Sequence, residues 1–146
     1  MLVTEIMTLD PACCMPETML PKVARLMVNM DCGEIPVVDD LENRQLLGVV
    51  TDRDIVCRAI AADRNPAEVE VSEVMTAPVI SVGEDADLQE CYEKMVQNQI
   101  RRIPVVDSQG KIIGIVAQAD IAREAGLLET AGILRNISRP VSRSSI

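Results

Sequence analysis

The sequence carries one pattern of residues twice, and this repeat limits the folds that the chain can adopt. Val-Thr-Glu-Ile-Met-Thr at 3–8 returns as Val-Ser-Glu-Val-Met-Thr at 71–76, and Ile-Pro-Val-Val-Asp at 35–39 returns at 103–107. The same interval separates both pairs, so no insertion lies between them. A duplicated unit usually packs about a pseudo-twofold axis, which would create two related clefts. Differences between the copies then indicate which cleft binds a ligand.

The length of the chain favours one core shared by the two copies. A chain of 146 residues buries roughly 70% of its unfolded surface, whereas either half alone would be marginal. The sequence has eight Met and a single aromatic residue, Tyr92. The core must therefore be filled by aliphatic and thioether side chains.

Composition excludes several classes of partner. A net charge of −9 argues against nucleic acid, because a phosphate backbone needs a basic surface. The longest apolar runs are too short for a membrane span, and the first residues do not resemble a signal peptide. The five Cys are odd in number and scattered, which predicts reduced thiols in a cytoplasmic protein.

Catalysis and metal binding also find no support in the sequence. The absence of His excludes His bases and His ligands. Cys13 and Cys14 are adjacent rather than spaced as CxxC, and the acidic loop clusters lack the spacing of a calcium loop. Cys57 is expected to be inert and partly buried on a helix. We therefore expect a protein that is not an enzyme, with no catalytic residue, no metal site and no catalytic cofactor.

Each copy predicts a short strand, a helix, two strands and a second helix, which is a mixed α/β (α+β) fold. In the first copy we expect a strand at 12–15, a helix capped near Thr18, strands at 34–39 and 45–50, and a second helix from Asp52. Both first helices carry an apolar stripe at helical spacing. The stripe residues are Leu20, Val23, Ala24, Met27 and Val28 in one copy, and Leu88, Cys91, Tyr92, Met95 and Val96 in the other.

The second copy predicts strands at 102–107 and 111–116 and a helix from Gln118 that continues toward Leu134. These elements give four segments. They are a first repeat at 1–62, a linker at 63–70, a second repeat at 71–126 and a C-terminal extension at 127–146. The extension is expected to begin as a helix and to end in a disordered polar tail.

The ordered motifs resemble the CBS domain family, specifically a tandem CBS pair (Bateman module) in a stand-alone protein. The resemblance covers about residues 3–125 and rests on both Met-Thr pairs, both Ile-Pro-Val-Val-Asp strands, and the segments 48–55 and 114–121. It implies two pseudo-twofold-related β-α-β-β-α CBS repeats packed through their sheets, commonly assembled as a homodimer. It also implies two clefts that bind adenosine-containing nucleotides for regulation rather than catalysis.

Thr51 and Asp54 are the principal candidates for a binding site, since they lie where a strand ends and a helix begins. A carboxylate there can accept hydrogen bonds from a ribose diol, and a hydroxyl with free N–H groups suits a phosphate. From spacing alone, the commoner explanation is that both residues cap the helix. The resemblance favours binding, because they match the family's ribose and phosphate positions.

Two differences between the copies favour the cleft built on Asp54. The second copy has Ala117 in place of Thr51, so its cleft lacks the hydroxyl. By resemblance, the basic residues before Ile-Pro of the other copy also contact phosphate. They are Arg101 and Arg102 for the Asp54 cleft, but Gly33 and Glu34 for the Asp120 cleft. Taken alone, Arg101 and Arg102 are better explained as solvated charges at a strand edge.

The resemblance further implies an apolar slot for adenine walled by Val49, Val79 and Ile80, each of which also suits an ordinary core strand. Arg53 is a further candidate for phosphate, although it could equally pair with Asp52 or face solvent. A weaker second cleft would use Asp120 and Ile35.

The function that these features favour is a regulatory module that binds AMP, ADP or ATP as a regulatory ligand. It would transmit occupancy to an unknown effector protein through a conformational change. One alternative is a structural or protein-interaction module with no ligand, which would tolerate the loss of Asp54. Another is a module that binds NAD or S-adenosylmethionine.

Overall fold

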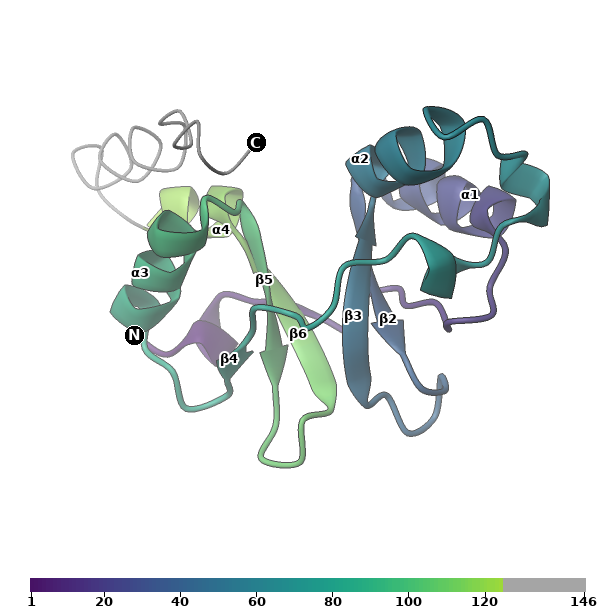
Figure 1. Ribbon diagram of the computed structural model, residues 1–146. Coiled ribbons are helices and arrows are strands. Elements are labelled where there is room, and N and C mark those ends of the chain that lie inside the picture. Colours follow the sequence, from purple (N-terminus) through teal and green to yellow (C-terminus); the bar gives the residue numbers. More distant parts are fainter. Residues whose placement is uncertain (125–146) are drawn as a thin grey trace. The chain divides into compact units, whose positions relative to one another are not determined.

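A computed structural model describes residues 1–124 of the chain, which form two compact units (Figure 1). The hairpin unit contains Asp10–Val79 and Gln109–Ile112, and the sheet unit contains Met1–Leu9, Ile80–Ser108 and 113–124. The predicted continuation of the last helix toward Leu134 and the extension at 127–146 lie outside the described residues. Each unit is considered separately below.

The hairpin unit contains the helix and strands predicted for the first copy. Helix α1 (Leu20–Met30) precedes strands β2 (Glu34–Val38) and β3 (Leu46–Thr51), which pair antiparallel with Ile35 opposite Val50. Helix α2 (Asp52–Ile55) continues directly into a wider helical turn at Val56–Ile60. The strand predicted at 12–15 is reduced to one parallel bridge, in which Cys14 bonds to Pro36 and Val38 of β2.

Helix α1 differs from its prediction at two points. It begins at Leu20 after Met19 without a side-chain cap, because the Thr18 hydroxyl instead accepts a hydrogen bond from the Met15 N–H at 3.0 Å. Within the predicted apolar stripe, Leu20, Val23 and Met27 are buried, but Ala24 and Val28 are exposed. The buried face is therefore narrower than the sequence pattern indicates.

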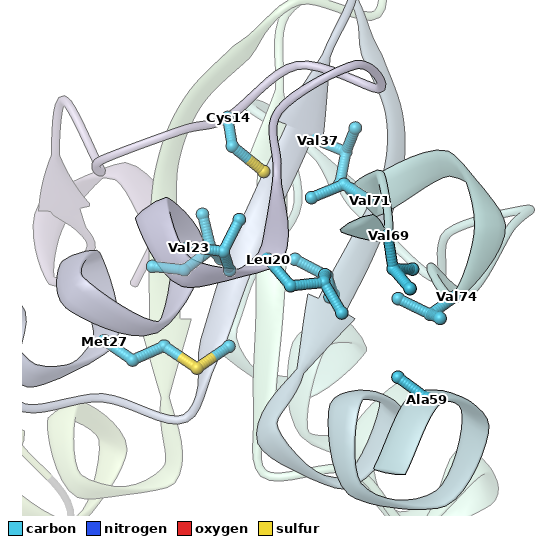
Figure 2. Close-up of a cluster of buried hydrophobic side chains, with 11 residues drawn as sticks. Cys14, Leu20, Val23, Met27, Val37, Ala59, Val69, Val71 and Val74 are labelled. Atoms are coloured by element: carbon cyan, nitrogen blue, oxygen red, sulfur yellow. The ribbon is translucent and has the colours of Figure 1, made fainter. Parts of the chain in front are cut away.

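The core of the hairpin unit draws on residues well beyond the first repeat (Figure 2). Val69, Val71 and Val74 pack with Leu20 and Val23 of α1. Backbone hydrogen bonds fix this segment, since the Leu20 N–H donates to Val69 O at 3.0 Å and the Val71 N–H donates to Thr18 O at 2.8 Å. Burying each such Val stabilises the unit by about 1.5–3 kcal/mol. The end of the predicted linker and the start of the second repeat therefore complete this core.

The sheet unit holds a four-stranded sheet in the order β1-β6-β5-β4. Strand β1 runs antiparallel to β6, and β4 runs parallel to β5. Helix α3 follows β4, and helix α4 follows β6, as the second copy predicts. The elements are β1 (Thr8–Leu9), β4 (Val82–Gly83), α3 (Leu88–Asn98), β5 (Arg102–Val106), β6 (Ile112–Ala117) and α4 (Gln118–Glu124).

The core of the sheet unit contains a residue from the very start of the chain. Val3 is fully buried and packs with Val82, Cys91, Met95 and other apolar residues of this unit. Its N–H donates a hydrogen bond to Ala86 O at 3.0 Å. Val3 and Val71 occupy equivalent positions in the two copies. Val3, from the first copy, completes the core that contains α3 of the second copy, and Val71, from the second copy, completes the core that contains α1 of the first copy.

Candidate functional site

The candidate site lies at the junction between β3 and α2. Thr51 is extended (φ −113°, ψ 163°) and forms the N-cap of α2. Its Oγ1 accepts a hydrogen bond from the Asp54 N–H at 3.0 Å, while its own N–H donates to Asp54 Oδ2 at 3.0 Å. This reciprocal capping box satisfies two N–H groups at the start of a helix. The capping role expected from spacing alone is therefore present, whether or not the site binds a ligand.

The Asp54 carboxylate has further partners besides the cap. Asp54 as a whole is only 8% exposed. The Thr76 hydroxyl donates toward both carboxylate oxygens, at 3.2 and 3.3 Å, and the Arg58 Nε lies 3.9 Å from Oδ1. Burial of a charged carboxylate is costly unless donors compensate it. Asp54 is thus a negative charge held close to the surface by a small set of donors.

Thr76 is the site residue that the sequence reasoning missed. The signal for it in the sequence is the pair Met75-Thr76, which repeats Met7-Thr8. An antiparallel bridge joins Thr76 to Val49, and the two backbone hydrogen bonds between them have N···O distances of 3.0 and 2.8 Å. A Cβ at Gly48 would lie 2.8 Å from Thr76 O, so only Gly permits this close approach.

The hairpin unit contains five of the residues predicted for the Asp54 site, and within it Thr51 and Asp54 are in direct contact. Val49 and Val79 are half-buried, and Arg53 is exposed on α2. The backbone N–H of Arg53 donates a hydrogen bond to Asp52 Oδ1 at 2.8 Å.

Three other predicted residues belong to the sheet unit. Ile80 and Arg101 are exposed, and Arg102 is half-buried at the start of β5. The Arg101 carbonyl accepts a hydrogen bond from the Gln118 N–H at 2.9 Å, which ties the start of α4 to the residue before β5. A shared role of these residues with Asp54 stays a prediction.

The predicted weaker site is constructed differently. Asp120, 7% exposed on α4, accepts a hydrogen bond from the Ala117 N–H at 2.7 Å and forms an ion pair with Arg123 of its own helix. Ala117 offers no hydroxyl. Ile35 is buried in the core of the hairpin unit, and its role as a wall of the second cleft also stays a prediction.

The thiols of the described residues are poorly suited to metal binding. Burial raises the pKa of Cys14 and of Cys91 to about 12, and it raises the pKa of Cys13 despite the opposing charge of Arg44. Cys57 is exposed, so the expectation of partial burial was wrong, because its side chain lies on the outer face of the helical turn. Within residues 1–124, no three Cys, Asp or Glu side chains are grouped as metal ligands.

The CBS domain model matches residues 3–59 and 71–126. The chain belongs to the CBS domain family. The CBS domain-containing protein YhcV of Bacillus subtilis is 39% identical over 137 residues, which are 93% of this chain and 94% of YhcV. The two chains therefore match along nearly the whole length of each.

Solved CBS structures confirm the mixed α/β fold with two repeats. Hypoxic Response Protein I, solved with two coordinated zinc ions, has a TM-score of 0.78 and 31% identity, covering 86% of this chain and 100% of that one. The present sequence has no His, and residues 1–124 contain no group of three or more Cys, Asp or Glu side chains that could hold a metal ion. None of the helices in that range is long and apolar enough to cross a membrane.

Two further CBS structures contain adenosine compounds. CBSX2 in complex with AMP has a TM-score of 0.74 and 26% identity, over 88% of this chain and 98% of that chain. The CBS domain pair of protein MJ0100, in complex with 5′-methylthioadenosine and S-adenosyl-L-methionine, has a TM-score of 0.75 and 29% identity, over 86% of this chain and 100% of that chain. Adenosine compounds are thus bound by CBS pairs similar to this one.

Proposed function

We propose that this CBS pair is a regulatory module that binds an adenine nucleotide, AMP, ADP or ATP, at a site built on Thr51 and Asp54. The observation that carries this proposal is the state of the Asp54 carboxylate. It is nearly buried, yet its one strong neutral partner is the Thr51 N–H, and the Thr76 hydroxyl is shared weakly between both oxygens. A carboxylate has about four acceptor positions, so it can accept hydrogen bonds from ribose hydroxyls while it keeps the bond from the Thr51 N–H.

The phosphate end of the ligand is assigned to basic residues. Arg53 is exposed near Asp54, and Arg101 and Arg102 are the further candidates in the sheet unit. Guanidinium groups bind phosphate through paired hydrogen bonds. Glu34, which replaces Arg102 at the equivalent position of the first copy, would repel phosphate from the Asp120 site. The proposal therefore assigns one strong site and one weak site.

Occupancy of this site would regulate an effector protein by favouring one conformation of the pair. A ligand shifts such an equilibrium only through its differential affinity for the two states. We assign the module to the cytoplasm on the strength of its free thiols.

Two alternatives have specific support. The MJ0100 complex favours S-adenosylmethionine, and with it other adenosine compounds such as NAD, as the ligand class. The complete capping box favours a module without any ligand, since Thr51 and Asp54 already have a structural role. Both alternatives retain the fold. They differ in whether a bound adenosine compound stabilises it.

A thermal unfolding panel separates these possibilities. The purified chain is heated with AMP, ADP, ATP, NAD, S-adenosylmethionine or 5′-methylthioadenosine, each over a concentration series. A ligand at 100-fold its dissociation constant adds about 2.7 kcal/mol of stability, which at this size raises Tm by roughly 5–10 °C. We expect the largest shift with AMP, ADP or ATP. No shift with any compound would leave the ligand-free module as the better account.

The homodimer implied by the family is also part of this proposal. Val28 on α1 is 80% exposed, and Val56 and Ile60, one helical turn apart after α2, are each 53% exposed. Large apolar side chains exposed on the helices of one unit favour burial against a second copy.

The assembly is tested by replacing Val56 and Ile60 together with Glu. Two charges on this face should convert a dimer into a monomer, measured by sedimentation velocity or light scattering. Leu41→Glu, in a turn where the side chain is also 53% exposed, is the matched control and should leave the dimer intact. A wild-type chain that sediments as a monomer at all concentrations would contradict the dimer.

A further inference from the structure

The Asp54 carboxylate accepts a hydrogen bond from a hydroxyl of the same chain. Thr76 Oγ1 lies 3.2 Å from Oδ1 and 3.3 Å from Oδ2. Two nearly equal distances place this hydroxyl across the open edge between the carboxylate oxygens. A ribose diol that donates to both oxygens approaches along the same edge. The hydroxyl and the diol therefore compete for one position.

The backbone around Thr76 holds the hydroxyl at this position. Val49 and Thr76 exchange both backbone hydrogen bonds, at 3.0 and 2.8 Å. The Arg58 Nη1 donates to Val74 O at 3.1 Å and to Met75 O at 3.0 Å, so the guanidinium fastens the preceding residues to the helical turn after α2. The backbone is thus fixed from both sides, whereas the side chain of Thr76 is exposed. Rotation about χ1 alone can withdraw the hydroxyl.

We propose that Thr76 is an internal latch on Asp54, which a nucleotide must open by replacing the Thr76 hydroxyl with its ribose diol. This inference rests on the nucleotide-binding function proposed above. The latch keeps the nearly buried carboxylate satisfied when no ligand is present, and it lowers nucleotide affinity by the free energy of the displaced hydrogen bond. Thr76 is thus a residue that positions the Asp54 carboxylate before a nucleotide binds, and it sets the affinity of that carboxylate for ribose.

The second copy provides an internal control. Thr8 is the equivalent of Thr76, and it lies in β1 opposite Ile115 of β6. The equivalent carboxylate, Asp120, is paired with Arg123 of its own helix. A substitution at Thr8 therefore removes the equivalent hydroxyl of the other copy and leaves the residues of the Asp54 site unchanged.

The test is the affinity for AMP and for ATP, measured by titration calorimetry on the full chain. Thr76→Val keeps the shape of the side chain and removes the hydroxyl. We expect it to bind about fivefold more tightly, as the loss of one weak hydrogen bond from the empty state predicts. Thr76→Ser, which keeps the hydroxyl, and Thr8→Val should both bind like wild type. The analogue 2′,3′-dideoxy-AMP has no diol and should bind weakly and equally to wild type and Thr76→Val.

The outcomes distinguish the latch from the function on which it rests. Wild-type binding of AMP or ATP with equal or weaker affinity in Thr76→Val overturns the latch and leaves the nucleotide site standing. Absence of binding by both wild type and Thr76→Val overturns the nucleotide site and the latch together. Binding by Thr76→Val alone supports the latch in its strongest form, in which the hydroxyl closes the site.

Discussion

Replacing Val71 by Asp should unfold the hairpin unit, although Val71 belongs to the second repeat. Val71 is fully buried and packs among the apolar side chains around Leu20. An unpaired carboxylate at such a position costs about 3–5 kcal/mol, which is a large part of the total stability of a small protein. Urea unfolding followed by circular dichroism measures the loss. Leu41→Asp, at an exposed position in a turn, is the control and should change stability little.

The location of the damage is as informative as its size. Limited proteolysis of Val71→Asp should give early cleavage between α1 and β3, within the first repeat. Val3→Asp should instead open the sheet unit, because Val3 packs with Val82 and Cys91. Early cleavage near α3 in Val71→Asp would contradict the assignment of Val71 to the core of the hairpin unit.

The second large effect concerns ligand affinity rather than stability. Asp54→Asn should weaken AMP binding about 100-fold, since hydrogen bonds to a charged group contribute roughly 1.5–3 kcal/mol each. The Asn carbonyl can still accept the bond from the Thr51 N–H, so the cap of α2 is largely retained. Titration calorimetry measures the affinity, and circular dichroism verifies the fold.

Asp120→Asn is the matched control for this loss. It changes the equivalent carboxylate of the second copy and should leave high-affinity AMP binding unchanged. A second check uses 2′-deoxy-AMP. The wild type should bind 2′-deoxy-AMP more weakly than it binds AMP, whereas Asp54→Asn should bind the two compounds with similar, weak affinity. Equal loss of affinity in Asp54→Asn and Asp120→Asn would show that the two sites are not the unequal pair proposed above.

The local elements were predictable because each has a short-range cause. Strand β2 begins at Glu34 as expected, and the second helices begin at Asp52 and Gln118 where the sequence places them. Repetition strengthened each prediction, since a pattern present twice is less open to chance. The Thr51–Asp54 contact was also predictable, because a hydroxyl and a carboxylate three residues apart suit a capping box.

The features that the sequence did not reveal depend on residues far apart in the chain. Burial of Val3 and Val71 in their respective cores follows from tertiary packing, and a leading segment of a few residues has no periodicity that would indicate it. The Thr76–Asp54 hydrogen bond spans 22 residues, so spacing within a motif could not predict it. Val28 fits the helical stripe but is exposed. Its exposure was not predictable, because the spacing of apolar residues does not show how wide a face the unit covers.

The exchange of leading segments has a consequence for how such a protein can be divided. A chain cut within 63–65 would give two fragments, of which each contains a piece required by the other: Val3 for the sheet unit and Val71 for the hairpin unit. Neither fragment carries a complete core, so neither is an independently inheritable building block. The smallest heritable module is the pair, and a gene that lost one repeat would lose the fold of the other.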